Sequence, residues 1–170
     1  MTATTTPSAR QQFLDSHARE TQTTLRVLRA YPRDKVDLRP HPKSKTAREL
    51  AWMFVVEQML TEKALTTGLD WSQAPSLPPV PGSYDEIIDT FQNRQQRVAD
   101  LVRSQPDDTF SGTVQFYTGP KVLGDVPMMQ FLWMILSDQI HHRGQFSIYL
   151  RMADGKVPSI YGPTADEPWR

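Results

Sequence analysis

Four stretches of the chain combine a helical spacing of apolar residues with an absence of proline. The prolines are clustered and leave free windows at 8–31, 43–71, 82–105 and 128–157. Because proline breaks the interior of a helix, long helices are expected in these windows. Apolar residues recur there at three- and four-residue steps, as on one face of a helix. In the last window this face carries Met128, Phe131, Ile135, Asp138, His142, Phe146 and Tyr149.

The starts of three of these helices are marked by local motifs. Thr46 with Glu49, and Ser83 with Glu86, have the spacing of a capping box, in which each side chain accepts a hydrogen bond from the other's backbone N–H. For the last helix we expect a cap at Asp125, Pro127 in the first turn and an end near 153.

Long connections join the four predicted helices. Together they indicate an all-α fold, a four-helix bundle that forms one domain over residues 1–170 and ends in a proline-rich C-terminal tail. The second and third connections are long enough to allow a non-adjacent helix order. In the third, residues 113–117 alternate between polar and apolar and end in Thr-Gly-Pro, which predicts a short hairpin or an extended segment.

Composition excludes several classes of function. Nineteen Lys and Arg balance nineteen Asp and Glu, so the basic surface of a nucleic-acid-binding protein is not expected. The longest uncharged apolar stretch, 131–136, is too short to span a bilayer, and the first ten residues lack the apolar core of a signal peptide. We therefore expect a cytoplasmic protein without membrane contact. With no cysteine, any metal must be bound by histidine and carboxylates.

The segment around Asp138 and His142 is the most informative for chemistry. The two residues lie four apart, so on a helix their side chains project about 40° apart in azimuth and can bind one ion. They share the inward face of the last helix, where unpaired polar groups are costly. Glu57 occupies the inward stripe of the second helix and is the expected third ligand. The alternative is a metal-free polar network in which Glu57 pairs with His142 or Arg143.

A pocket is expected around these three residues. Its other predicted members are Met53, Phe131, Ile135 and Tyr149 on the same inward faces, with His141 and Arg143 on neighbouring faces of the last helix. His17 is interpreted as a packing residue and His41 as a loop residue, so neither is counted as a ligand.

The C-terminal part of the chain resembles the DinB/YfiT-like superfamily. The resemblance rests on HHRGQ at 141–145, followed by a tyrosine, LR, a short glycine turn, VP and IYGP, and on RPHPKS leading into TARELAW at 46–52. It implies a DinB-like four-helix bundle, a homodimer, and a divalent metal such as Zn, Ni, Mn or Fe bound by three histidines. Two of those histidines correspond here to Met53 and Asp138, and the third is His142. Related enzymes act with a low-molecular-weight thiol.

Two functions are therefore considered. The first is a metal-dependent protein that carries out thiol-dependent transferase or hydrolase-like chemistry on a small molecule. The second is a non-catalytic, metal-free bundle that acts by binding a small ligand or by dimerisation. Apolar residues off the pocket face, among them Trp133, Met134 and Ile148, predict a helix-face dimer. The alternative is that the connections and the tail from 159 to 170 cover this surface within one chain.

Overall fold

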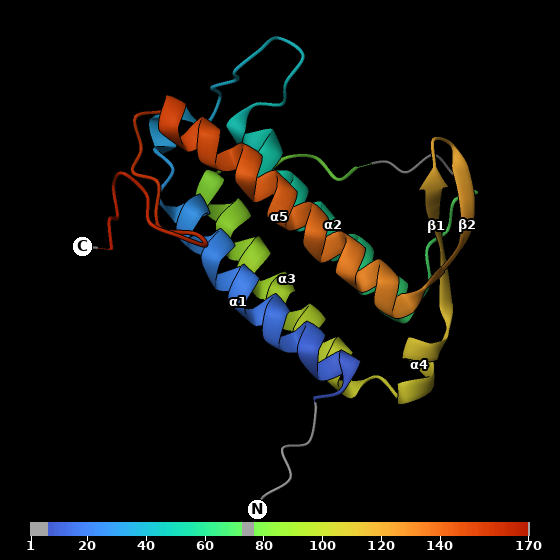
Figure 1. The fold of residues 1–170 in the computed structure, drawn as a ribbon. Helices are drawn as coiled ribbons and strands as arrows, with labels where there is room; N and C mark the ends of the chain where they lie inside the picture. The colour runs from blue at the N-terminus through green and yellow to red at the C-terminus, as the bar shows by residue number, and fades with distance from the viewer. Residues whose placement is uncertain (1–6, 73–76, 170) are drawn as a thin grey trace, which may run out of the picture.

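The computed structural model describes residues 7–72 and 77–169 and contains four long helices (Figure 1). These are α1 (Ala9–Arg29), α2 (Ala47–Thr66), α3 (Tyr84–Ser104) and α5 (Met128–Met152). Shorter elements are the 3₁₀ turn η1 (Arg33–Lys35), the helix α4 (Asp107–Ser111) and the strands β1 (Thr113–Gly119) and β2 (Val122–Pro127). No helix within the described residues has the length and apolarity needed to cross a bilayer.

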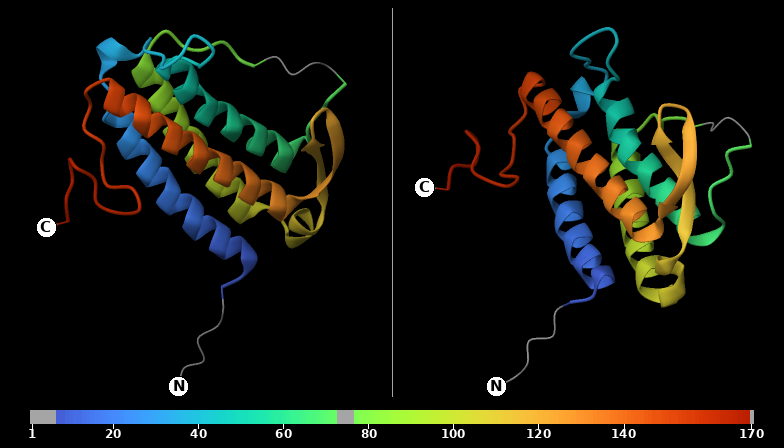
Figure 2. Two further views of the ribbon diagram at one scale, coloured as in Figure 1. Left: turned by 45° about the horizontal axis from the view of Figure 1, so that its top comes forward. Right: turned by 45° about the vertical axis from the view of Figure 1, so that its right-hand side comes forward.

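The four long helices form a bundle in which α1 and α2 lie on a diagonal. Helix α1 packs against α3 and α5, and α2 packs against the same two helices from the other side (Figure 2). The expected non-adjacent order is therefore present. The first connection joins the diagonal pair α1 and α2, and the third joins the diagonal pair α3 and α5. The second connection joins the neighbours α2 and α3, so the expectation that it allows the non-adjacent order is wrong.

Of the three predicted helix starts, one is confirmed in full, one in part and one is wrong. At Thr46 both hydrogen bonds of the capping box with Glu49 are present, whereas at Ser83 only its acceptance from the Glu86 backbone N–H is found. Ser8, which was not predicted as a cap, caps α1. The expected cap at Asp125 is wrong: this residue lies in β2 opposite Gln115, because the strand continues up to the first turn of α5.

The strands β1 and β2 form the predicted hairpin at the end of the bundle where α5 begins (Figure 1). They are antiparallel, and the turn places Lys121 at a φ of 60°. Val114 and Val126, which are paired across the two strands, are both buried and belong to the adjoining core. The hairpin thereby covers one end of the bundle.

A layer of buried polar side chains crosses the middle of the bundle and separates two apolar clusters. We call it the polar layer; it consists of His17 from α1, Gln58 from α2, Gln95 from α3 and Gln139 from α5. Gln95 Nε2 donates to Gln139 Oε1 at 3.0 Å. Phe54, Phe91 and Phe146 lie in the apolar cluster on one side, and Phe13 and Phe131 in the cluster on the other.

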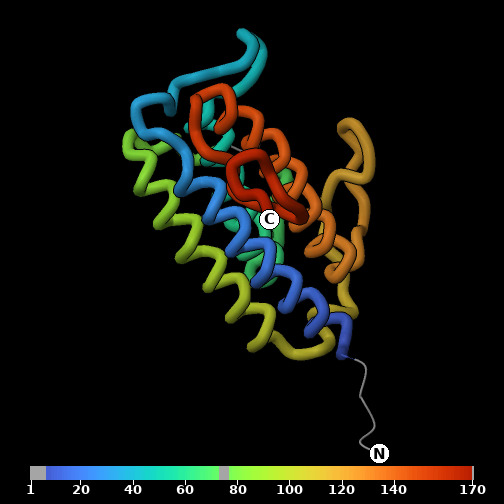
Figure 3. Tube along the Cα trace, turned by 60° about the vertical axis from the view of Figure 1, so that its left-hand side comes forward, coloured from blue at the N-terminus to red at the C-terminus, as the bar shows by residue number. Residues whose placement is uncertain are grey.

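The segment after α5 folds back along α1 and α5 (Figure 3). Asp166 accepts from the Val157 backbone N–H and pairs with Arg151, and Glu167 accepts from the Ser159 backbone N–H. Arg26 of α1 donates to the carbonyl of Ser159. The tail is therefore attached both to itself and to α1.

Candidate metal centre

Three potential metal ligands meet between the middle of α2 and the middle of α5. One ligand atom each from Glu57, Asp138 and His142 lies within 4.8 Å of the others. Asp138 and His142 are one turn apart on α5, and Glu57 faces them from α2, as the helical spacing indicated. We call these three residues the Glu57 cluster.

Glu57 is the buried member of the cluster. Its side chain is 3% exposed, and its Oε1 lies 2.6 Å from Nδ1 of His142. Its Oε2 is buried and has no hydrogen-bond partner among the described residues. Burial raises the pKa of this carboxyl from 4.5 to about 7; the hydrogen bond from His142 acts against that rise, and the charge of Asp138 adds to it.

His142 and Asp138 are more accessible than Glu57. The hydrogen bond to Glu57 raises the pKa of His142, while partial burial of the ring acts in the opposite direction. The edge of the ring packs against Phe54, with the centroids 6.2 Å apart. Asp138 is exposed at the rim of the site. The cluster therefore has a buried base and an open side.

The chemistry of this donor set fits a divalent metal ion. Two ligand atoms bound at about 2.0–2.2 Å can lie at most about 4.4 Å apart, so the observed grouping needs only a small adjustment of the exposed Asp138 side chain. The unpartnered Oε2 of Glu57 is a buried oxygen that an ion would satisfy. Without an ion, Glu57 and His142 form the metal-free pair that the sequence also allowed.

A cavity of about 410 Å³ opens beside Glu57 and Asp138. We call it the apolar cavity, because most of its wall is formed by Met53, Val56, Leu60, Phe116, Met134 and Ile135. The polar residues that line it are Glu57, Ser137, Asp138 and His141. Met53, Ile135 and His141 line the cavity, as the sequence predicted. Met134 lines it as well, so its expected place off the pocket face is wrong.

A second cavity of about 400 Å³ lies on the other side of His142. We call it the Lys45 cavity; Lys45, Gln145 and Tyr149 line it together with His142. The Tyr149 hydroxyl donates to the carbonyl of Lys45 at 3.0 Å. Tyr149, predicted for a single pocket, thus belongs to this second one.

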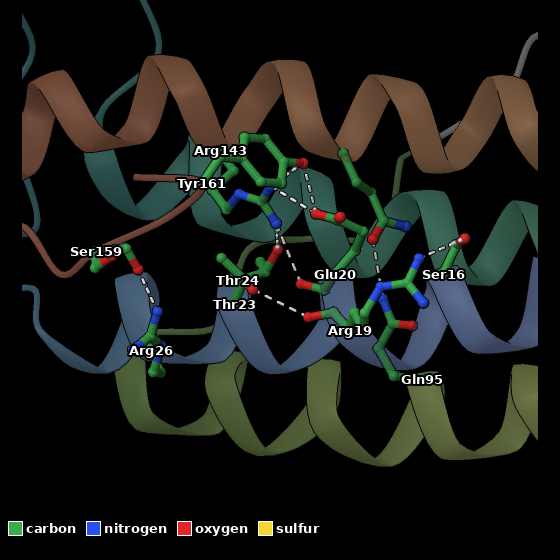
Figure 4. Close-up of polar contacts among 11 residues, drawn as sticks. Ser16, Arg19, Glu20, Thr23, Thr24, Arg26, Gln95, Arg143, Ser159 and Tyr161 are labelled. Atoms are coloured by element: carbon green, nitrogen blue, oxygen red, sulfur yellow. Dashed lines mark hydrogen bonds and ion pairs between the residues drawn. The ribbon is translucent and has the colours of Figure 1, made fainter. Parts of the chain in front are cut away.

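Two residues expected at the pocket line neither of these cavities. Phe131 is fully buried in the core behind Phe116, with the ring centroids 5.1 Å apart. Arg143 points toward α1 (Figure 4), because one step along a helix rotates a side chain by about 100° away from its neighbour.

Arg143 is 1% exposed and is surrounded by polar partners. It pairs with Glu20 at 2.6 Å and donates to Thr24 Oγ1 at 3.2 Å and to Tyr161 Oη at 2.7 Å. The Tyr161 hydroxyl in turn donates to Glu20 at 2.8 Å (Figure 4). We call these four residues the Arg143 cluster; it ties α1, α5 and the tail together.

Sequence reasoning missed Lys45 and Phe116 as residues beside the site. Lys45 directly precedes the capping box of α2, and a residue at that place is positioned by the helix start. Phe116 belongs to the alternating segment that predicted the hairpin. Both elements were predicted, but their position relative to the α2–α5 interface depends on tertiary packing.

The fold and the site together define a four-helix bundle with a polar, potentially metal-binding cluster between two of its helices. The chain belongs to the DinB family: the family model matches residues 1–169.

Solved structures with this fold include proteins described by metal- or thiol-dependent activity. A DinB-like protein from Bacillus cereus ATCC 10987 is 25% identical, covering 89% of this chain and 97% of its own, with a TM-score of 0.72. YfiT from Bacillus subtilis, described as a probable metal-dependent hydrolase, has a TM-score of 0.64 at 12% identity over 91% of this chain and 93% of its own.

A mycothiol-dependent maleylpyruvate isomerase shares the fold as well. Its TM-score is 0.59 at 16% identity, and the match covers 81% of this chain but 60% of the isomerase. These two more distant likenesses establish a shared fold.

Proposed function

We propose that this DinB-family protein binds one divalent metal ion through Glu57, Asp138 and His142 and acts on a small molecule bound beside it. The observation that carries the proposal is that one ligand atom each from Glu57, Asp138 and His142 lies within 4.8 Å of the others. In addition, Oε2 of Glu57 is buried and has no hydrogen-bond partner among the residues that the structure describes. Support also comes from the metal dependence stated for YfiT.

When bound, such an ion would supply Lewis-acid activation of a water or thiol by lowering its pKa. The chain's own residues would do the rest. Glu57 and His142 already lie side by side, with Oε1 2.6 Å from Nδ1, and an ion bound through these two atoms would replace their hydrogen bond and release its proton. Because the wall of the cavity on the side of Glu57 is mostly apolar, a ligand that fills it would displace water from that side. The reaction class we propose is hydrolase-like or thiol-dependent transfer, in line with the mycothiol dependence of the related isomerase fold.

The donor set favours a harder ion than three histidines would. Two carboxylates and one imidazole suit Mn or Fe better than Zn or Ni. Met53 lines the apolar cavity one turn before Glu57, and a thioether is a poor ligand for these ions. A Met53→His variant should therefore gain affinity for Zn and Ni.

Calorimetric titration with Mn²⁺ and Zn²⁺, after removal of any ion with a chelator, tests the proposal. We expect one ion per chain for the unaltered protein and loss of that binding in Asp138→Ala and in His142→Ala. His141→Ala, which changes a residue at the cavity wall outside the Glu57 cluster, should keep it. Full stoichiometry in both ligand variants, or no binding by the unaltered protein, would contradict the assignment.

We also propose that two copies associate through α5. Trp133 and Ile148 remain 37% and 60% exposed after the tail has folded back on α1 and α5. Large apolar side chains left uncovered on one helix are typical of a subunit interface. Light scattering should give twice the monomer mass, and Ile148→Asp should halve it without unfolding. A monomer mass at micromolar concentration would contradict the dimer and favour closure within one chain.

A further inference from the structure

Two members of the Glu57 cluster, Glu57 and Asp138, line the apolar cavity, so a ligand that fills it lies against them. Six apolar side chains from α2, β1 and α5 form most of the remaining wall. A volume of about 410 Å³ is within the range of small-ligand pockets. The apolar wall and the Glu57 cluster would therefore contact different parts of one ligand.

Packing behind Phe116 fixes the hairpin side of the cavity. Its ring contacts Phe131 of α5 and Trp71 of the α2–α3 connection, with centroids 5.1 Å and 5.6 Å away. Trp71 Nε1 also donates to the carbonyl of Gln115 at 2.7 Å. The cavity is therefore bounded by side chains that other parts of the core hold in place.

The charges around the cluster favour an anionic ligand once a divalent metal ion is bound. The carboxylates of Glu57 and Asp138 would balance that metal ion, and the ammonium of Lys45 is then an unbalanced positive charge in the adjoining cavity, which His142 also lines. Lys45 lines its cavity together with His142, and no acidic side chain is among the described residues that line it. An anionic head group beside His142 would therefore meet a net positive charge.

We propose that the ligand of this site is an amphipathic anion, with an alkyl or aryl group in the apolar cavity and a carboxylate-like head at the Glu57 cluster facing Lys45. This inference rests on the proposed metal function. It adds the substrate class, which the comparisons with known proteins do not supply.

The test is calorimetric titration of the Mn²⁺-loaded protein with acetate, butanoate, hexanoate and octanoate. Burial of each methylene should increase the affinity about fourfold. Leu60→Trp and Met134→Trp, which fill the cavity from α2 and from α5, should remove this dependence on chain length. Met59→Trp adds the same bulk at the neighbouring position, which does not line the cavity, and should retain it.

The head group is tested with 1-octanol and octylamine, which carry the same chain without a negative charge. Octanoate should bind more tightly than either, and Lys45→Met should reduce that preference. Equal affinity for acetate and octanoate by a protein that binds Mn²⁺ would overturn this inference and leave the metal function intact. Absence of Mn²⁺ binding would overturn both the proposed function and the head-group assignment. In that case, loss of 1-octanol binding in Leu60→Trp would still support binding of an alkyl group in the apolar cavity.

Discussion

His142 and Arg143 are neighbours in the sequence, yet they belong to two polar clusters of opposite character. In the Arg143 cluster, the guanidinium, the Glu20 carboxylate and the Tyr161 hydroxyl each contact the other two. In the Glu57 cluster, one carboxylate oxygen is buried without a partner, and cavities lie on both sides. The difference is that the Arg143 cluster satisfies its polar groups internally, whereas the Glu57 cluster combines an unpartnered carboxylate oxygen with two further ligand atoms, as a metal site does.

The largest expected effect lies in the satisfied cluster. Arg143→Met keeps most of the apolar length of the side chain but leaves Glu20 without its buried cation. Removing one partner of a buried pair typically costs about 3 kcal/mol or more, and we expect that loss in the free energy of unfolding. Urea denaturation measures it. Arg19→Met, which changes an exposed arginine of α1 outside the Arg143 cluster, should change stability by less than about 0.5 kcal/mol. Equal effects of the two substitutions would remove the distinction between the clusters.

His17 extends the comparison to a third buried polar group, with an effect that depends on pH. Burial lowers the pKa of His17 from 6.5 to about 4. Between these pH values His17 is protonated in the unfolded chain but neutral in the folded chain. Stability should therefore fall as pH drops below 6.5, by about 2 kcal/mol between pH 7 and pH 5.

Comparison with His17→Gln isolates this contribution. Because glutamine does not titrate, the variant should lose less stability than the unaltered protein over the same pH range. Denaturant titrations at the two pH values measure the difference. Parallel losses in both proteins would show that His17 does not account for the acid sensitivity.

The Glu57 cluster should show the opposite dependence on pH in the metal-free protein. The raised pKa of Glu57 means that ionisation between pH 4.5 and about 7 disfavours the folded state, so stability falls as pH rises. The raised pKa of His142 acts in the same direction, because the stabilisation from its proton is lost as that proton dissociates.

Glu57→Gln should therefore gain stability relative to the unaltered protein as the pH rises from 5 to 8, by about 2 kcal/mol. The variant should also bind metal more weakly, because residues that serve function often reduce stability. Thermal unfolding in the presence of a chelator gives the first result. A variant that is less stable at both pH values would show that Glu57 is a structural residue.

The smallest effect is expected from Tyr161→Phe. The ring stays in place and only the hydroxyl between Arg143 and Glu20 is removed, while their ion pair remains. The variant loses both hydrogen bonds of this hydroxyl, but Tyr161 is 65% exposed and water replaces them, so we expect a cost of about 1 kcal/mol. Urea denaturation should resolve this cost against Tyr117→Phe, which changes an exposed tyrosine of the hairpin. If the variant were as destabilised as Arg143→Met, the tail would contribute more than these two hydrogen bonds.

Much of the fold follows from local signals in the sequence. Proline placement and the capping box at Thr46 predict the long helices because both act within a few residues. The same holds for Glu57, Asp138 and His142, since helical spacing alone puts two of them on one face. The orientation of Arg143 and the place of Phe116 were not predictable, because they depend on which helix or hairpin packs alongside.

The polar layer has a consequence for the vertical alignment of the helices. Its members come from the middle of all four long helices, and the bond between Gln95 and Gln139 joins α3 to α5 across the bundle. If one helix slipped by a turn, about 5.4 Å, buried amides would face apolar side chains, and the cost of unpaired polar groups opposes such a slip. An apolar stripe alone would tolerate the shift more easily. The polar layer therefore fixes the axial positions of the helices and keeps Glu57 on α2 at the same height as Asp138 and His142 on α5.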